Sequence, residues 1–425
     1  MERQDLYIEI NREIQQNKDG LIKLGRELFS CPEPGFKEVE SNQILTSFLR
    51  GHGIPCRPDL CLTGILATIG SGDGYHIALV ADMDALVVND GEKSYPCHSC
   101  GHSIQTAVMA GVLKMLKDLN IAEETGGRIS FIAAPAEEFI EFDYRQKLKE
   151  EGKINYFSGK QNMIEQGVFD DVDCVLTMHV NGETETLFDV NSTLAGFMVK
   201  KAVFTGQASH SGAAAHMGRN ALHGASLCMD AVAYMKDQFP ADAGLQIHPV
   251  ITECGGSVNI IPEKAVLETY VRANTLAALL DAGEKFDLCA VHSAAALGLS
   301  CRIENRTGYM PLKQSKELNE IIYRHMREIC PEEKIIKNVV SGASGDIGDL
   351  GYLLPAVQFG FSGIRGRIHS SDFAIVDEEN AYLHTAEIVM KTVCDILTCP
   401  GLQVKNEDFK ERKEFYLKNW LYKEI

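Results

Sequence analysis

The sequence lacks any apolar run that approaches the roughly 20 residues needed to span a bilayer. Its first residues, Met1 to Asp5, contain no apolar signal core. Its 13 cysteines are scattered and do not show the fixed spacings of a disulfide framework. These absences argue against membrane insertion and export. They favour a reducing cytoplasm in which most cysteines are free and buried.

Positive charge is also scarce. The 41 lysines and arginines are outnumbered by 59 aspartates and glutamates, which gives a formal net charge of −18 at pH 7. This balance argues against nucleic acid or an anionic membrane as the main partner. The length of 425 residues, with 45% hydrophobic and 24% charged residues, is that of a soluble globular protein with two domains and a large core.

The first part of the chain alternates helix and strand patterns. Segments with apolar residues at helical spacing are followed by short apolar runs that end at turn-forming or acidic residues. We predict helices over 5–30, 38–50 and 104–119, and strands over 62–69, 75–81, 128–134 and 173–180. Such alternation is typical of an α/β domain whose mixed sheet carries helices on both faces.

A different order begins near residue 193. Strands predicted over 197–204, 245–252, 265–273 and 300–306 are separated by helices over 220–235 and 276–296. The order βαββαβ is that of a ferredoxin-like α+β sandwich. We therefore predict one domain from residues 1–192 and 311–425, with residues 193–310 inserted in it. The closing segments are predicted as helices over 315–330 and 380–398, a strand over 356–360, and a surface helix from Asn406.

Potential metal ligands follow three of the predicted strands. Asp82 and Asp84 end one, Glu137 and Glu138 follow another, and His179 ends a third. In α/β sheets, sites collect at the carboxyl ends of strands. Adjacent carboxylates suit a division of roles in which one binds metal while the other acts as general base on metal-bound water. The ordinary alternatives are a solvated acidic loop for the glutamates and a hydrogen-bonded core residue for the histidine.

Cys100 and His102 place a thiol and an imidazole one residue apart, just before a predicted helix. Thiolate and imidazole are good ligands for a borderline divalent ion such as zinc. The triplet alone fits any metal site, including a structural zinc site. His369 lies in a polar loop after a strand, where alone it is most simply a loop histidine.

The inserted domain carries three further polar candidates. His210 could polarise a substrate carbonyl, and Asn259 could contact the same oxygen. Arg272 could pair with a substrate carboxylate. Considered singly, each is more simply a structural residue.

Taken together and in order, these motifs resemble the dinuclear-metal peptidase and amidohydrolase family that includes aminoacylases and glutamate carboxypeptidases. The chain looks most like the branch of hippurate hydrolase, the indole-acetyl-amino-acid hydrolases and the aminobenzoyl-glutamate hydrolases. The resemblance extends from Pro32 to the last core helix. Six matched motifs carry it, over residues 81–86, 98–102, 135–138, 178–180, 259–262 and 369–373.

The resemblance implies an amidohydrolase that cleaves an N-acyl or N-aroyl amino acid, or a dipeptide-like amide. It implies two divalent metal ions, zinc or manganese, that activate a water molecule. The implied ligands are Cys100, His102, Glu138, His179 and His369. Cys100 is a candidate bridge between the two ions, and a cysteine ligand favours zinc.

The resemblance also implies the remaining roles. Glu137 would be the general base, and Asp84 would orient a ligand. Residues 1–192 and 311–425 would form the catalytic, metal-binding domain, and residues 193–310 would mediate homodimerisation. His210 would then stabilise the oxyanion in the partner's site, while Asn259 and Arg272 would bind substrate.

Several positions depart from the family pattern. Ser103 replaces an aspartate, Gln105 a histidine and Ala134 a glutamine, and the proline common after the His210 motif is absent. These changes concern metal affinity and substrate class more than reaction type. Residues 139–158 also form a longer, aromatic-bearing connection than relatives seem to have. This segment is either a lid or specificity loop, or a surface elaboration or dimer contact.

Two other functions fit the same residues. An aminopeptidase or dipeptidase would use the same site and differ in requiring a free amino terminus. A non-catalytic binding protein on this scaffold is suggested by Ser103 and Gln105. Retention of all five candidate ligands and of Glu137 favours the enzyme.

Overall fold

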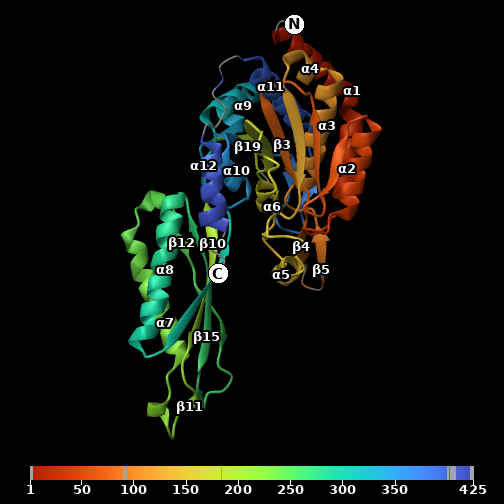
Figure 1. Cartoon of the computed structure of the whole chain (residues 1–425). Coiled ribbons are helices and arrows are strands. Elements are labelled where there is room, and N and C mark those ends of the chain that lie inside the picture. The colour runs from red at the N-terminus through yellow and green to blue at the C-terminus, as the bar shows by residue number, and fades with distance from the viewer. Residues whose placement is uncertain are drawn as a thin grey trace. The chain divides into compact units, whose positions relative to one another are not determined.

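The computed structural model describes residues 3–89, 91, 93–182, 184–399, 402 and 408–421. The chain divides into two compact units, each described here by itself (Figure 1). Unit 1 comprises Met1–Ser192, Lys313–Val339 and Asp349–Phe409. Unit 2 comprises Thr193–Leu312, Val340–Gly348 and Lys410–Ile425.

An eight-stranded mixed sheet forms the centre of unit 1. Its strands run in the order β1-β2-β6-β3-β7-β19-β8-β17. Strands β6, β3, β7 and β19 are parallel, and the β1–β2 and β2–β6 pairs are antiparallel. Strand β8 pairs antiparallel with β19 and parallel with β17. The bounds are β1 Cys56–Leu60, β2 Gly64–Ile69, β3 His76–Asp82, β6 Arg128–Ala134, β7 Cys174–Val180, β8 Phe188–Val190, β17 Ile335–Lys337 and β19 Ala356–Phe361. The predicted mixed α/β sheet is confirmed.

The central strands β3, β6 and β7 are almost wholly buried because both faces of the sheet are covered. Every residue of β3 is buried, as expected of a parallel strand packed on two sides. Helix α3 packs on β3, β6 and β7, and α1 and α11 pack on α3. Helices flank the sheet on both sides in Figure 1. Their bounds are α1 Arg3–Phe29, α2 Val39–Gly51, α3 His102–Asp118, α4 Ile121–Thr125, α5 Phe142–Glu150, α6 Gly159–Glu165, α9 Lys316–Ile329 and α11 Thr385–Thr398.

Unit 2 contains the strands and helices predicted within residues 193–310, together with Val340–Gly348 and Lys410–Ile425. Its strands lie in the order β12-β15-β10-β16, with β13 also paired to β15, and all of these pairs are antiparallel. Helices α7 and α8 pack on each other and on the sheet. The bounds are β10 Gly196–Thr205, α7 Ala221–Met235, β12 Gln246–Ile247, β13 Val250–Cys254, β15 Lys264–Ala273, α8 Leu276–Ala296 and β16 Ser300–Thr307. This is the ferredoxin-like arrangement that the βαββαβ order predicts.

Two predicted elements differ from the structure. The strand predicted over 245–252 is two strands, β12 and β13, because Pro249 between them has no backbone N–H to donate to a ladder. The surface helix predicted from Asn406 begins outside the described residues. Its described part, α12 (Phe409–Phe415) and the π-helical turn after it, is not wholly at the surface, because Tyr416 and Trp420 are buried.

None of the described helices combines the length and the apolar content that crossing a bilayer requires.

Candidate metal centre

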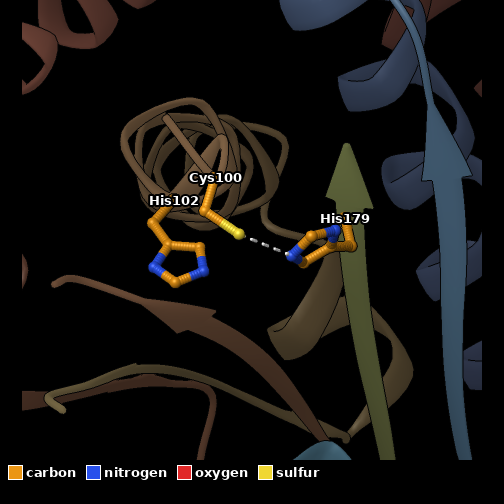
Figure 2. A group of neighbouring side chains, drawn as sticks. All are labelled: Cys100, His102 and His179. Carbon is orange, nitrogen blue, oxygen red and sulfur yellow. Dashed lines mark hydrogen bonds between the residues drawn. The ribbon is translucent and has the colours of Figure 1, made fainter. Parts of the chain in front are cut away.

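The turn between β5 (Ser94–Cys97) and α3 brings together a thiol and two imidazoles. Gly101 adopts a φ of 78°, and a side chain there would collide with Val180, so the position requires glycine. This sharp turn places Cys100 just before α3 and His102 in its first turn, opposite His179 at the end of β7 (Figure 2). The Cys100 Sγ lies 3.4 Å from Nε2 of His179.

The same thiol also belongs to a second group of side chains. The Cys100 Sγ lies 3.3 Å from Nε2 of His369, and that nitrogen lies 3.4 Å from Oε1 of Glu138. His369 has a φ of 65°, and its backbone N–H donates to the carbonyl of Ser99 over 2.9 Å. A left-handed conformation at a non-glycine residue is costly, and such residues cluster at functional sites.

The acid pair completes a third group. His102, Glu137 and Glu138 each offer an atom within 4.8 Å of the others, and Nε2 of His102 lies 4.0 Å from Oε2 of Glu137. Both glutamates follow β6, and the chain turns between the strand and the acid pair at Ala136, which has a φ of 56°. The three groups overlap, so the five predicted ligands and Glu137 lie in one cluster within unit 1.

The imidazoles of His102 and His179 are held at Nδ1, the ring nitrogen that points away from the cluster. Nδ1 of His102 lies 2.9 Å from the carbonyl oxygen of Asp84 and 3.3 Å from its Oδ1. Nδ1 of His179 lies 2.9 Å from the carbonyl oxygen of Val180. If each Nδ1 carries the hydrogen for these bonds, each Nε2 is left as an electron-pair donor toward the cluster.

The chemistry of this cluster fits divalent metal ions. Nε2 of His102 and Oε1 of Glu138 are buried and have no hydrogen-bond partner among the described residues. Burial, together with nearby carboxylates, raises the pKa of the Cys100 thiol well above its ordinary value, so its thiolate needs a cation beside it. A tetrahedral zinc ion holds its sulfur and nitrogen ligands about 3.5 Å apart, close to the Cys100–His179 and Cys100–His369 separations.

Unit 2 carries the three remaining predicted residues. His210 and Asn259 lie on neighbouring segments, since β11 (Ser209–His210) pairs with β14 (Ile260–Ile261) and the N–H of Ser211 donates to the carbonyl of Asn259. Both side chains are exposed. Nδ1 of His210 accepts hydrogen bonds from the backbone N–H groups of Gly212 and Ala213, over 3.2 and 3.1 Å.

Arg272 lies at the other end of the same sheet. It is opposite Phe197, at the start of β10, whereas β11 follows the far end of β10. Its Nη1 donates to Oγ of Ser344 over 2.7 Å, and its guanidinium lies over the rings of Phe197 and Tyr270. The structure therefore brings His210 and Asn259 together but places Arg272 apart from them.

Comparison with known proteins identifies the family. Residues 78–395 match the model of peptidase family M20/M25/M40, which is about three quarters of the chain. The chain belongs to this family.

Individual family members resemble the protein over most of its length. It is 23% identical over 393 residues to an IAA-amino acid hydrolase (ILR1-like 2) of Arabidopsis thaliana, covering 89% of this chain and 82% of that one. It is 26% identical over 362 residues to the N-acetyl-L-cysteine deacetylase of Bacillus subtilis, covering 81% and 80%. The YXEP protein of Bacillus subtilis, described as a dinuclear metal-binding peptidase of family M20, superposes with a TM-score of 0.68 at 20% identity and covers 89% and 98%.

These matches confirm the predicted family, the fold, and the enzyme class of metal-dependent amidohydrolase.

One departure from the family pattern, Gln105, has a structural role. Gln105 is not in the ligand cluster; its Oε1 accepts from the N–H of Asp82 over 2.8 Å, and its Nε2 donates to Oγ1 of Thr177 and to the carbonyl of Met178. It thereby joins the ends of β3 and β7 behind the site. The Ser103 hydroxyl is buried without a hydrogen-bond partner in the described part of the chain.

Sequence reasoning missed three buried charged residues around the cluster. Glu38 accepts from the backbone N–H of Ala136, Lys160 pairs with Asp82, and Arg145 contacts the turn that carries the acid pair. Burial, and then the charge of Asp84, raise the pKa of Glu38 to about 8. None of the three lies in an apolar periodic pattern, so no signal in the sequence distinguishes them from solvated surface charges.

Proposed function

We propose that the protein hydrolyses N-acyl or N-aroyl amino acids, or dipeptide-like amides, to a carboxylic acid and an amino acid. One observation carries this proposal: the adjacent residues Glu137 and Glu138 reach a cluster of one thiol and three imidazoles from different parts of unit 1. A structural zinc site is closed by four ligands on one ion, so an additional carboxylate beside those ligands would have no role in it.

The proposed ligands of two divalent ions are Cys100, His102, Glu138, His179 and His369, with Cys100 between the two groups. When bound, the ions would polarise the amide carbonyl and lower the pKa of a water molecule. We propose zinc or manganese. Asp84 orients His102 and also accepts a hydrogen bond from the N–H of Glu138 over 2.9 Å, so it supports two ligands at once.

Glu137 is the proposed general base. Its carboxylate takes a proton from the attacking water as the oxygen adds to the amide carbon. It then delivers this proton to the leaving nitrogen as the C–N bond breaks, so that an amine departs. A glutamate firmly bound to metal could not exchange this proton, which is why a base next to the ligand Glu138 is useful.

His210 is proposed to stabilise the oxyanion in the partner's site of a homodimer. Because its Nδ1 accepts two backbone hydrogen bonds, its Nε2 carries the ring hydrogen in the neutral form and faces outward as a donor. Asn259 on the adjoining segment is proposed to donate to the same substrate.

Arg272 is proposed to bind the carboxylate of the amino-acid product half. Within unit 2, eight residue pairs of the β10–β15 ladder separate Arg272 from the end nearest His210, which is about 26 Å of strand. A small substrate cannot contact both side chains of one chain. This separation supports a site that uses Arg272 of one chain and His210 of another.

The proposed location is the cytoplasm. All 13 cysteines are free thiols, and seven of them are buried. Free thiols persist in reducing compartments.

A substrate panel tests the proposal. Metal-free protein is reloaded with zinc or manganese and incubated with N-acetyl, N-benzoyl and indole-acetyl amino acids, with free dipeptides of the same residues, and with carboxamide-capped analogues. Mass spectrometry of the products is expected to show cleavage of acylated substrates with a free carboxylate. Preference for free dipeptides would indicate a dipeptidase instead. Metal binding without cleavage of any amide would indicate a binding protein and overturn the proposal.

A further inference from the structure

Residues 139–158, here called the connecting segment, are built into unit 1. Leu148, Ile154 and Phe157 are buried. Leu148 and Ile154 join Phe36 and Ala136 in a small apolar cluster separate from the main core. The segment therefore packs against the turn that follows β6, which is the turn that carries the acid pair.

A fully buried arginine lies at the centre of this packing. Arg145, in α5, has no exposed surface. Its Nη1 donates to the carbonyls of Phe157 and Ala136, over 2.6 and 3.4 Å, and its Nη2 donates to the carbonyl of Glu138. No carboxylate of the described residues lies within ion-pair distance of its guanidinium. Because a buried charge is costly unless it is well hydrogen-bonded, these carbonyls are the groups that hold the charge in place.

The turn that Arg145 contacts contains a residue with a positive φ, and side chains from several segments hydrogen-bond to its backbone. Ala136 has a φ of 56°, a left-handed conformation that is unfavourable for a non-glycine residue. Its N–H donates to Oε1 of Glu38 over 2.9 Å, and the N–H of Glu138 donates to Oδ2 of Asp84 over 2.9 Å. Arg145 binds the carbonyls of the same two residues. Glu137 thus lies between Ala136 and Glu138, and the backbone N–H and carbonyl groups of both neighbours are hydrogen-bonded.

We propose that Arg145 is a positioning residue, and that the connecting segment is a buttress that aims Glu137 and Glu138 at the metal cluster. The planar guanidinium is suited to this role because its fork reaches separate carbonyls at fixed angles, which a single ammonium group cannot do. The connecting segment is then neither a mobile lid nor a surface elaboration. This inference rests on the proposed function for the roles of the two glutamates.

Two variants and one matched control test the inference. R145M removes the guanidinium while keeping much of the side-chain volume, and R145K keeps a cation but loses the fork. K391M is the control, because Lys391 is also a buried cation, paired with Glu328 and Glu387 on helices α9 and α11 and remote from the cluster. Each protein is assayed for thermal stability, for the dissociation constant of zinc by chelator competition, for the thiolate–cobalt absorption of the cobalt form, and for kcat and KM.

R145M is expected to bind metal about tenfold more weakly, as mutations of groups that orient ligands do, and to alter the cobalt spectrum. Its kcat is expected to fall about 100-fold with little change in KM, because a displaced base slows the chemical step without weakening substrate binding. R145K should recover part of both losses. K391M should lower only the melting temperature.

The inference is overturned if R145M loses stability as K391M does but keeps wild-type metal affinity and kcat. If R145M does not fold, R145K decides in the same way, and failure of both variants to fold would show that the arginine serves the fold alone. The zinc and cobalt measurements need no substrate. Weaker metal binding in R145M, with no amide hydrolysis by the wild type, would therefore refute the proposed function and leave the positioning role standing.

Discussion

Asp84 presents two oxygens to His102: its carbonyl oxygen lies 2.9 Å from Nδ1 of the imidazole, at hydrogen-bond distance, and its Oδ1 lies 3.3 Å from the same nitrogen, at ion-pair distance. Its other carboxylate oxygen accepts the N–H of Glu138. One buried residue therefore links the ligand at the start of α3 to the ligand after β6. This link explains why two segments far apart in the sequence present their ligands to the same point.

Replacing Asp84 with asparagine should weaken metal binding. The amide must turn an NH₂ group toward either the Nδ1 hydrogen of His102 or the N–H of Glu138, and two donors then face each other. We expect the zinc dissociation constant of D84N to rise about 10- to 100-fold. D395N, which also removes a buried aspartate charge but lies away from the cluster, should keep wild-type affinity. Equal affinity in D84N and the wild type would contradict the orienting role.

Replacing Glu137 with glutamine should separate metal binding from catalysis. Glutamine cannot take a proton from water, so we expect kcat to fall by about 10³-fold in E137Q, within the range typical of a general base. Metal content measured by mass spectrometry should stay at the wild-type value. The neighbouring E138Q is the matched comparison and should lose metal as well as activity. Wild-type turnover in metal-loaded E137Q would rule out this base.

Mixing two inactive variants should restore activity if His210 acts in the partner's site. A heterodimer of E137Q and H210A has one site with both native residues, and random mixing makes half of the dimers heterodimers. We therefore expect about a quarter of wild-type turnover per chain. Heterodimers isolated with two different affinity tags and found to be inactive would place His210 outside the partner's site.

A buried network on the helices of unit 1 should control stability at acid pH. Asp395 accepts from the hydroxyl of Tyr7 over 2.5 Å, lies 3.1 Å from Nε2 of His325 and pairs with Arg3. Burial alone would raise the pKa of Asp395, but the hydrogen bonds from these partners lower it below its usual value. The carboxylate therefore stabilises the fold above about pH 4, and this contribution is lost as the pH falls through the lowered pKa.

In D395N the free energy of unfolding at pH 7 should fall by about 3 kcal/mol, because removing one partner leaves buried charges uncompensated. Its loss of stability between pH 4 and pH 2 should be smaller than that of the wild type. Urea denaturation across this range measures both effects. D19N, at an exposed site on α1, the helix that carries Arg3 and Tyr7, should match the wild type. A D395N curve parallel to that of the wild type would contradict the lowered pKa.

Much of the fold could be predicted from the apolar runs and the helical periodicity of the sequence. The strand over 128–134 and the helix over 276–296 have the predicted bounds, because apolar runs and helical periodicity record burial directly. Pro249 divides the strand predicted over 245–252 into two, and the apolar residues on both sides of it suggest one continuous strand. The buried end of the last segment, with Trp420, depends on tertiary contacts such as the hydrogen bond from Thr307 to its carbonyl.

The candidate ligands could be found because parallel strands end at the same edge of a sheet. His179 lies near the end of β7 and Glu138 comes shortly after the end of β6, so both lie at that edge of the sheet. The residues just before α3 reach the same edge. The charged residues that hold these ligands could not be found. Arg145 lies among polar residues whose sequence resembles that of an exposed helix. Glu38 precedes α2, and nothing in the sequence around it indicates that it is buried, as it is in the structure. Their partners are backbone groups, whose positions only the folded chain defines.

The cluster around Cys100 is proposed to hydrolyse amides with bound metal. The most direct test titrates metal-free protein with zinc or manganese and measures bound metal and hydrolysis of an N-acyl amino acid in the same sample. We expect no turnover without metal, a rise with occupancy, and a plateau at about two ions per chain. Turnover that persists undiminished without metal, or a fully loaded protein that cleaves no N-acyl amino acid, would contradict the proposal.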